Sequence, residues 1–245
     1  MNTDAVMAPT VHSGAVFPAS AEVELVQAFF DGRCDGTFVE VGANDPFNRS
    51  ATHHLEVLGW SGALVEPLPD CAAALRAGRT ATVVEAACVA TAQAGQTAKL
   101  HVAGPHSSLD HRLAEPRSRT GTFIEVSVMT LDEVIEQAAL DRVDLLAVDT
   151  EGTEMDVLEG IDLLRHAPSL ILLEDHVHDW SKCRYMRSRG YTLIRRTGYN
   201  SWYVPRAAGI SVGLFGRLQL FNRYVLKMPL KRLRRWRHLR EADRS

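Results

Sequence analysis

The chain has 245 residues, of which 46% are hydrophobic, and its formal net charge at pH 7 is −3. A chain of this size can bury one substantial core, which favours a single domain with appendages. No run of about 18 apolar residues occurs, so we expect no transmembrane helix. The charge is uneven, because residues 217–245 carry +8 and the remaining residues −11. The acidic body and the basic tail are therefore expected to meet different partners.

The N-terminal residues have neither a basic segment nor a continuous apolar segment, so they predict a loose leader and not a signal peptide. The four cysteines show no CxxC pair and no framework spacing, which is typical of reduced thiols in an intracellular protein. We expect a cytoplasmic protein with a flexible leader (1–20), a central domain (21–206) and a basic amphipathic tail (207–245).

Five short apolar runs alternate with helical patterns in the central domain. The runs are β-branched and mostly continuous, as in strands buried on both faces of a parallel sheet, and they occupy 37–42, 62–67, 82–87, 144–149 and 169–175. The helical patterns occupy 19–32, 50–59, 69–78 and 130–140, the last opened by a capping box of Thr130 and Glu133. This alternation predicts an α/β fold with a Rossmann-like, doubly wound, mostly parallel sheet.

Four further segments have strand-like patterns. Residues 97–103 and 123–128 predict a strand pair around a polar loop, and residues 191–196 and 201–205 predict an antiparallel edge that closes the sheet.

Each of the five apolar runs carries an acidic residue near its end. These acids are Glu40, Glu66, Glu85, Asp149 and the pair Glu174–Asp175. Ligands of open parallel sheets bind outside the carboxyl ends of the strands, so acidic residues at all five strand ends predict a functional cleft there.

The first of these strand ends excludes the common nucleotide motifs. Gly42 is followed by Ala43, Asn44 and Asp45, so the glycine-rich dinucleotide fingerprint and the P-loop lysine motif are both missing. An acidic turn would repel phosphate, and it suits a cofactor with a positive end, such as an ammonium or a sulfonium.

Glu66 and Glu40 are further candidates at the same edge. Glu66 lies 24 residues after Gly42, where a carboxylate commonly accepts the ribose hydroxyls of an adenosine cofactor, although it could also be a lone surface acid before Pro67. Glu40 lies inside its strand and could instead be a buried acid with a paired donor.

The segments VEVGANDP, LGWSGALVEPLPD, VVEAACV, TLDEV, DLLAVDTEGTEMDVLEG and LILLED together resemble the FkbM-type methyltransferases over residues 36–205. These are class I S-adenosylmethionine-dependent enzymes, many of which O-methylate sugars. The most specific element is D-x-E-G-x-E-x-x-V-L-x-G at residues 149–160. The resemblance implies a set of cofactor-binding residues, with Gly42 and Asn44 around the methionine end, Glu66 on the ribose, Ala86 and Ala87 near the adenine, and Glu40 and Asp45 close by.

The acidic block divides into two pairs. Thr153 and Asp156 read as a capping box, so Glu154 and Asp156 would lie in a first helical turn where the helix dipole favours acids. Asp149 and Glu151 precede that cap, and we expect them to belong to the site.

A sugar hydroxyl is a poor nucleophile at neutral pH and needs a general base or a metal ion. Asp149, Glu174 and Asp175 could hold Mg²⁺, in a pattern similar to metal-dependent macrolide sugar methyltransferases. Many FkbM members have an apolar residue where Asp175 stands, so a metal-independent reaction is the favoured alternative. Glu151 and His176 are candidate bases.

Other histidines and the polar loop 101–121 offer additional candidates. His178 could act as a base or lie on the surface, and a helix-face role is favoured for His53 and His54. The loop could be a substrate arm or an unstructured insertion. Its candidate ligands for a glycan or phosphate are Ser107, Ser108, Arg112 and Arg117.

The tail has an apolar stripe at helical spacing, formed by Leu214, Leu218, Phe221, Val225 and Met228, with cationic residues beside it. A basic amphipathic helix fits an anionic membrane surface, and we expect such contact through residues 212–240. The stripe could instead pack on the body or on a second subunit. Nucleic-acid binding is disfavoured, because the body is acidic and no binding motif is present.

We therefore expect an S-adenosylmethionine-dependent O-methyltransferase that acts on a sugar hydroxyl of a glycan, glycolipid or glycosylated metabolite, at the inner face of the membrane if the acceptor is lipid-linked. Carboxyl methylation is a variant of this hypothesis. Two rivals are a Mg²⁺-dependent hydrolase or phosphotransferase that uses Asp149, Glu174 and Asp175, and a non-catalytic, membrane-tethered partner protein.

Overall fold

The computed structural model describes residues 19–114, 121–176, 180–210, 212–226 and 228–229. Its main sheet has seven strands in the order β3-β2-β1-β7-β8-β10-β9. The strands are β1 (Thr37–Val41), β2 (Ser61–Val65), β3 (Thr82–Val84), β7 (Leu145–Val148), β8 (Leu170–Glu174), β9 (Tyr191–Thr197) and β10 (Asn200–Pro205). The first five run parallel, and β10 is antiparallel to both of its neighbours, β8 and β9. The doubly wound, mostly parallel sheet with an antiparallel edge is confirmed.

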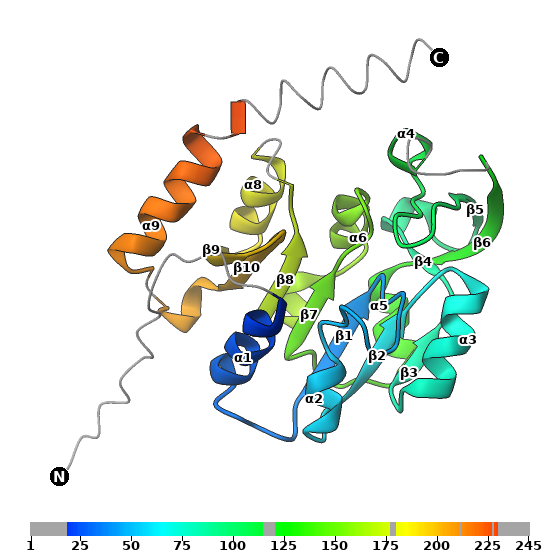
Figure 1. Ribbon diagram of the computed structural model, residues 1–245, viewed down its shortest axis with the longest axis horizontal. Coiled ribbons are helices and arrows are strands. Elements are labelled where there is room, and N and C mark those ends of the chain that lie inside the picture. Colours follow the sequence, from blue (N-terminus) through cyan, green and yellow to red (C-terminus); the bar gives the residue numbers. More distant parts are fainter. Residues whose placement is uncertain (1–18, 115–120, 177–179, 211, 227, 230–245) are drawn as a thin grey trace.

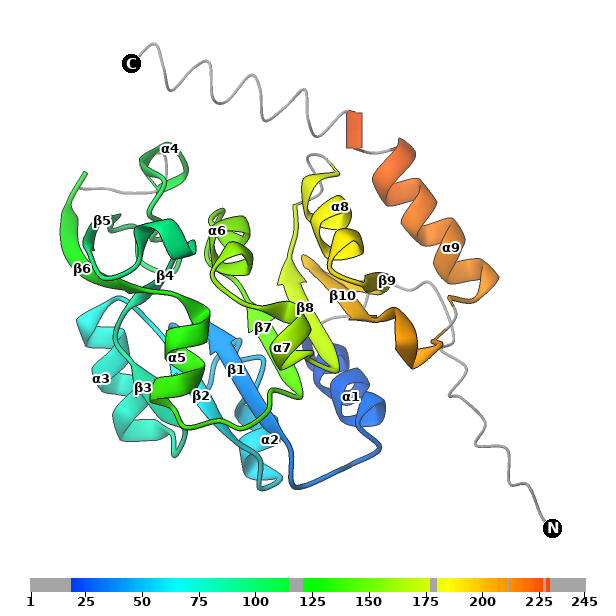
Figure 2. The ribbon, with the colours of Figure 1, turned by 180° about the vertical axis from the view of Figure 1, so that it is seen from behind.

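Helices cover both faces of this sheet (Figures 1 and 2). One face packs on α1 (Ala19–Phe29), α2 (His53–Val57) and α3 (Pro69–Gly78), and the other on α5 (Leu131–Gln137), α6 (Glu154–Glu159), α7 (Leu163–His166) and α8 (Ser181–Ser188). Alternate strand residues supply the two cores, so Phe38 belongs to the first and Val39 to the second. Apolar side chains on both faces explain why the strand sequences read as continuous apolar runs.

A smaller sheet lies beside β3, in the order β4-β6-β5, from β4 (Ala87–Cys88), β5 (Thr97–His101) and β6 (Phe123–Met129). The run expected to form one strand over 82–87 is thus divided between two sheets. The division follows from a tight turn, in which the Ala86 N–H donates to the Val84 carbonyl at 3.2 Å. Beyond the turn, Ala87 and Cys88 pair with β6.

The described part of the tail forms α9 (Leu214–Phe221) and a π-helical turn, Asn222–Leu226. Tyr224 and Met228 are buried and pack with Cys183 and Leu193. Met228 therefore does not share an exposed stripe with the other apolar residues of the tail, and the expectation of a single five-residue stripe is wrong for it. Among the described residues, no helix has the length and apolar character needed to cross a bilayer.

Candidate functional site

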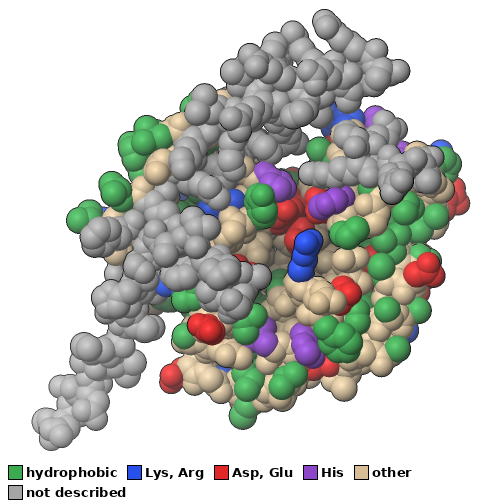
Figure 3. All heavy atoms as spheres, in the orientation of Figure 1, with side chains coloured by type: hydrophobic (Ala, Val, Ile, Leu, Met, Phe, Trp, Pro, Cys, Tyr) green, Lys and Arg blue, Asp and Glu red, His purple; other side chains and the backbone are tan. Residues whose placement is uncertain are grey.

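A pocket opens at the carboxyl edge of the main sheet, where β1 and β7 are neighbours whose connections leave in opposite directions. Counted out to the open solvent, the hollow holds about 560 Å³ of empty space. Its lining includes nine residues expected from the sequence, namely Gly42, Asn44, Glu66, Ala86, Ala87, Ser107, Ser108, Asp149 and Glu151. In Figure 3, acidic side chains gather in a hollow on one face, with histidines beside them.

Gly42 brings two walls of this pocket into contact. It has a φ of +83°, and its N–H donates to the Val65 carbonyl at 2.9 Å. A methyl group in place of its hydrogen would overlap the carbonyl oxygen of Asp149. The turn after β1 and the turn after β7 can therefore meet only if this position carries no side chain.

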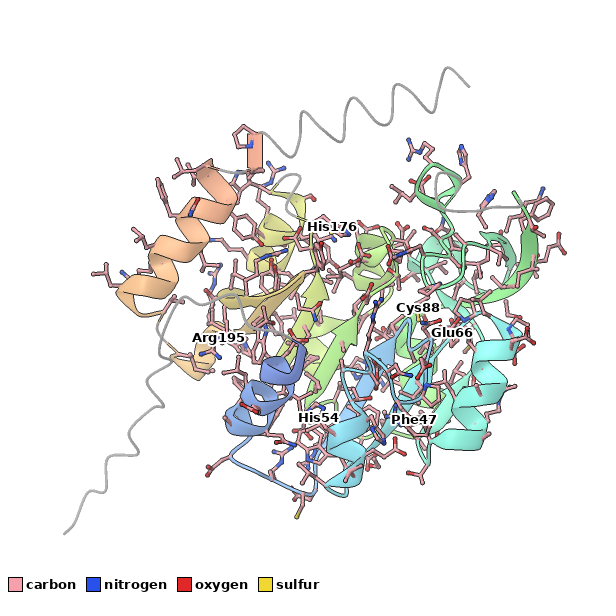
Figure 4. All side chains as sticks on the ribbon, in the orientation of Figure 1. Phe47, His54, Glu66, Cys88, His176 and Arg195 are labelled. Atoms are coloured by element: carbon pink, nitrogen blue, oxygen red, sulfur yellow. The ribbon has the colours of Figure 1, made fainter. Side chains whose placement is uncertain are left out.

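Glu66 holds the turn after β1 from the end of β2. One carboxylate oxygen accepts the Asn44 N–H at 2.9 Å, and the other accepts the Leu68 N–H at 2.9 Å. Each oxygen keeps a second lone pair for a ligand hydroxyl. Burial raises the pKa of Glu66, although the two backbone hydrogen bonds oppose this shift. Cys88 also lines the pocket, and Figure 4 labels it close to Glu66 and well apart from His176.

Asp149, Glu174 and His176 form an acidic cluster at the ends of β7 and β8. The His176 Nε2 lies 3.1 Å from the Glu174 Oε1. Burial raises the pKa of Asp149, and the nearby Glu174 and Glu151 carboxylates raise it further. Burial opposes the ionisation of Glu174, but His176, Asp149 and Lys182 together outweigh it and lower the pKa of Glu174. At neutral pH the Asp149–Glu174 pair is therefore disposed to hold a proton or a cation.

The polar loop between β5 and β6 forms the outer wall of the pocket. The His106 Nδ1 lies 2.7 Å from the Glu151 Oε1, and the Ser108 hydroxyl donates to the Glu151 carbonyl at 3.1 Å. These contacts hold Glu151 in the left-handed region, with a φ of 53°. Such a conformation in a residue other than glycine is uncommon, and it occurs preferentially at functional turns.

The family model described as Methyltransferase FkbM domain matches residues 40–199. The chain belongs to the FkbM methyltransferase family. The structure of methyltransferase FkbM from Methylobacillus flagellatus KT is similar to it, with 16% sequence identity and a TM-score of 0.45. That similarity covers 69% of this chain and 43% of the other, so the chain spans less than half of that protein's length. A comparison with curated proteins gave no match. Family membership supports a methyltransferase.

Besides Glu174, three acids with expected site roles in this FkbM domain do not line the pocket. The first, Glu40, is buried on the other face of β1, where it accepts hydrogen bonds from Ser50, the Ala51 N–H and Thr52. It organises the start of α2, so the interpretation as a buried, paired acid is correct and the cofactor role is not supported.

Asp45 is the second acid outside the pocket. It turns toward solvent, and its Oδ1 accepts the N–H groups of Phe47 and Asn48 at 2.9 and 2.7 Å. These hydrogen bonds lower its pKa. Asp45 shapes the connection to α2 instead of lining the pocket.

Asp175 is the third, and its position contradicts the expected Mg²⁺ ligand set of Asp149, Glu174 and Asp175. The Asp175 Oδ2 accepts the Tyr224 hydroxyl at 2.7 Å and lies 3.8 Å from the Arg196 Nη1. Successive residues of an extended chain point to opposite sides, so Glu174 and Asp175 do not converge on one ion. The hydrolase hypothesis loses its proposed metal centre for the same reason.

The FkbM acidic block does not form the expected second capping box. Thr153 makes no side-chain capping bond, whereas Thr130 and Glu133 form their box as expected. Glu154 is instead fully buried, where it accepts the Gly152 N–H at 2.7 Å and the Lys182 ammonium at 2.7 Å. Its role is structural, and it lies with Asp156 in the first turn of α6 as expected, where the ion pair with Lys182 adds to the favourable helix dipole.

His53 and His54 both lie on α2. The ring of His53 contacts that of Phe47, and burial lowers the pKa of His54 to about 4. Both positions agree with the expected helix-face roles. Arg112 pairs with Asp110 beside the pocket. His178 and Arg117 lie outside the described residues.

Two residues of the FkbM site were missed from the sequence. His106 sits in the polar loop, 45 residues before its partner Glu151. Lys182 reaches back from α8 to Glu154 and to the Glu174 carbonyl, at 2.7 and 2.6 Å. A buried acid requires a donor, but the polar sequence around Glu154 gave no sign that it would be buried, so no local signal pointed to Lys182.

Proposed function

We propose that this protein is an S-adenosylmethionine-dependent O-methyltransferase that acts on a sugar hydroxyl of a glycan, glycolipid or glycosylated metabolite. The observation that carries the proposal is the Glu66 carboxylate, which follows the second strand and lines the pocket of an FkbM domain, with each oxygen holding one backbone N–H. Both oxygens can accept ribose hydroxyls while they hold the turn after β1.

The charge of the pocket supports the same cofactor. Glu66, Asp149 and Glu151 all line it. Negative walls disfavour a phosphate-bearing nucleotide and attract a ligand with an ammonium and a sulfonium group. When bound, S-adenosylmethionine would supply an electrophilic methyl group. Gly42 and Asn44 would contact its amino-acid end, and Ala86 and Ala87 would lie near its adenine.

The chain's own acids can prepare an acceptor hydroxyl. A general base works best with a pKa near the working pH, and burial and neighbouring carboxylates move the pKa of Asp149 in that direction. Asp149 would take the hydroxyl proton, while Glu151 and His176 orient the acceptor. Holding the acceptor oxygen in line with the methyl group can lower the barrier by about 7–11 kcal/mol.

The proposal is tested by methyl transfer from radiolabelled S-adenosylmethionine to a panel of methyl glycosides and a glycolipid extract. We expect base-stable label, because methyl ethers resist mild alkali and methyl esters do not. Asp149→Asn should reduce the rate by about 10²–10⁴-fold, the typical contribution of a general base. Asp156→Asn, in the same acidic block, should retain the wild-type rate. Base-labile label would indicate carboxyl methylation, and no label in any fraction would contradict the proposed acceptor class.

The outer face of α9 supports a membrane-associated acceptor. Leu214, Leu218, Phe221 and Val225 are 79%, 64%, 52% and 43% exposed and follow each other at helical spacing. Tyr224 occupies the opposite side and packs on the body. Self-packing therefore does not explain the exposed stripe. Because the tail sequence is cationic, we propose that the stripe enters the headgroup region of an anionic membrane on the cytoplasmic side.

Vesicle sedimentation tests this contact. The protein should sediment with vesicles that contain phosphatidylglycerol, less with pure phosphatidylcholine, and less again at high salt, which screens charge. The double substitution Leu218→Glu with Phe221→Glu should abolish sedimentation. Leu164→Glu, at a residue that is 72% exposed far from the tail, is the matched control. Wild-type sedimentation of the double variant would contradict the proposal, as would a stable dimer in solution that the double variant breaks.

A further inference from the structure

The acidic cluster contains a second arrangement of ligand atoms, distinct from the one expected from the sequence. Glu151, Glu174 and His176 each offer one ligand atom, and these three atoms lie within 4.8 Å of one another. Ligand atoms about 2.0–2.2 Å from a metal ion are at most about 4.4 Å apart, so a small closing movement brings all three onto one ion. We propose that these residues bind a divalent transition-metal ion.

A buried oxygen without a donor is the second observation that points to a ligand here. Glu174 is 5% exposed, and its Oε2 has no hydrogen-bond partner among the described residues. An isolated buried carboxylate oxygen is expensive, so its presence indicates that something else satisfies it. The neighbouring Asp149 adds another carboxyl group, so the oxygen needs either a proton shared with Asp149 or a cation. The nitrogen of His176 and the carboxylate of Glu151 within reach make a cation the better complement.

The existing contacts already have the geometry of a metal centre. The Glu174 Oε1 and His176 Nε2 lie 3.1 Å apart, which is the separation of about 3 Å expected for adjacent ligands on one ion. The ring of Tyr199 contacts that of His176 with centroids 5.0 Å apart. His106 orients Glu151 through its 2.7 Å contact, in the way that outer residues fix metal-binding carboxylates.

The donor set selects the kind of metal. Mg²⁺ and Ca²⁺ prefer oxygen ligands alone, whereas an imidazole nitrogen with two carboxylates suits Mn²⁺, Fe²⁺ or Zn²⁺. The site therefore takes a transition-metal ion in preference to Mg²⁺. If the proposed function holds, the ion lies at the wall of the pocket, since Glu151 belongs to both.

The test uses Mn²⁺ as the probe and does not depend on methyl transfer. Full-length protein is freed of metal with a chelator, and MnCl₂ is titrated while the paramagnetic resonance signal of free Mn²⁺ is recorded. We expect one ion to bind per chain, with excess Mg²⁺ competing poorly. His176→Ala and Glu174→Gln should each weaken binding at least about tenfold. His111→Ala, an exposed histidine of α4 (His111–Ala114), should not change it.

Two results would overturn the proposal. One is wild-type protein that is folded by circular dichroism and leaves the Mn²⁺ signal unchanged, which would show that Glu174 and His176 form an ion pair alone. The other is binding that both variants retain. Titration of S-adenosylhomocysteine into the same samples separates these outcomes from a failure of the proposed function, because cofactor binding through Glu66 does not require the metal.

Discussion

Glu66→Gln is expected to weaken binding of S-adenosylhomocysteine by about 100-fold. The substitution keeps the shape of the side chain but removes the charge that two ribose hydroxyls would meet. Hydrogen bonds to charged groups contribute about 1.5–3 kcal/mol each. Partial loss of two such bonds amounts to about 3 kcal/mol, and every 1.4 kcal/mol is about tenfold in affinity. Calorimetric titration of the purified protein measures the change directly.

In the wild-type protein the Asn44 and Leu68 N–H groups each donate to one oxygen of Glu66. A glutamine would place its NH₂ group against one of these two donors, and that hydrogen bond would be lost. A modest fall in melting temperature should therefore accompany the loss of affinity. Glu85→Gln is the matched control, because Glu85 follows β3 as Glu66 follows β2 but pairs with Arg76 on the surface. An unchanged affinity in Glu66→Gln, with the fold intact by circular dichroism, would remove the ribose role of Glu66.

Gly42→Ala is expected to lower both stability and cofactor affinity. Alanine at a φ of +83° is strained by about 1–2 kcal/mol. Its methyl group would also overlap the Asp149 carbonyl oxygen, and overpacking adds about 1–3 kcal/mol. A total of about 3 kcal/mol corresponds to a fall of about 6–12 °C in the melting temperature of a domain of this size.

Gly95→Ala separates backbone strain from steric overlap as causes of the lost stability. Gly95 also has a positive φ, +74°, but a methyl group there would meet nothing within 4 Å. This variant should lose about half as much stability and keep its affinity for S-adenosylhomocysteine. Differential scanning calorimetry measures the melting temperature of both variants. Equal falls in melting temperature would show that backbone strain alone lowers stability, and that the turns after β1 and β7 can move apart without further cost.

The secondary structure was predictable because its signals are local. Apolar runs identified the five parallel strands, and the spacing of Thr130 and Glu133 identified the capping box that opens α5. Parallel strands bring their carboxyl ends to one edge, so the approach of Gly42, Glu66 and Asp149 followed from topology before any contact was known. The acidic turn likewise disfavoured phosphate without knowledge of the pocket.

The direction of individual side chains depended on neighbours that are distant in the sequence. Tyr224 and Arg196 contact Asp175 on the side away from Glu174. Thr52 and Ser50 donate hydrogen bonds to Glu40 on the face of β1 that does not line the pocket. Nothing near these acids in the chain distinguishes them from the acids that reach the pocket.

The amino-acid sequence by itself therefore determined the strand–helix alternation, the edge that carries the site and the FkbM resemblance, because periodicity and turn chemistry act over a few residues. Tertiary structure decided which carboxylates meet. The contact of His106 with Glu151 spans 45 residues, and that of Lys182 with Glu154 spans 28. Pairings of this kind depend on how the loops and α8 pack over the sheet edge, and long-range packing leaves no periodic signal in the sequence.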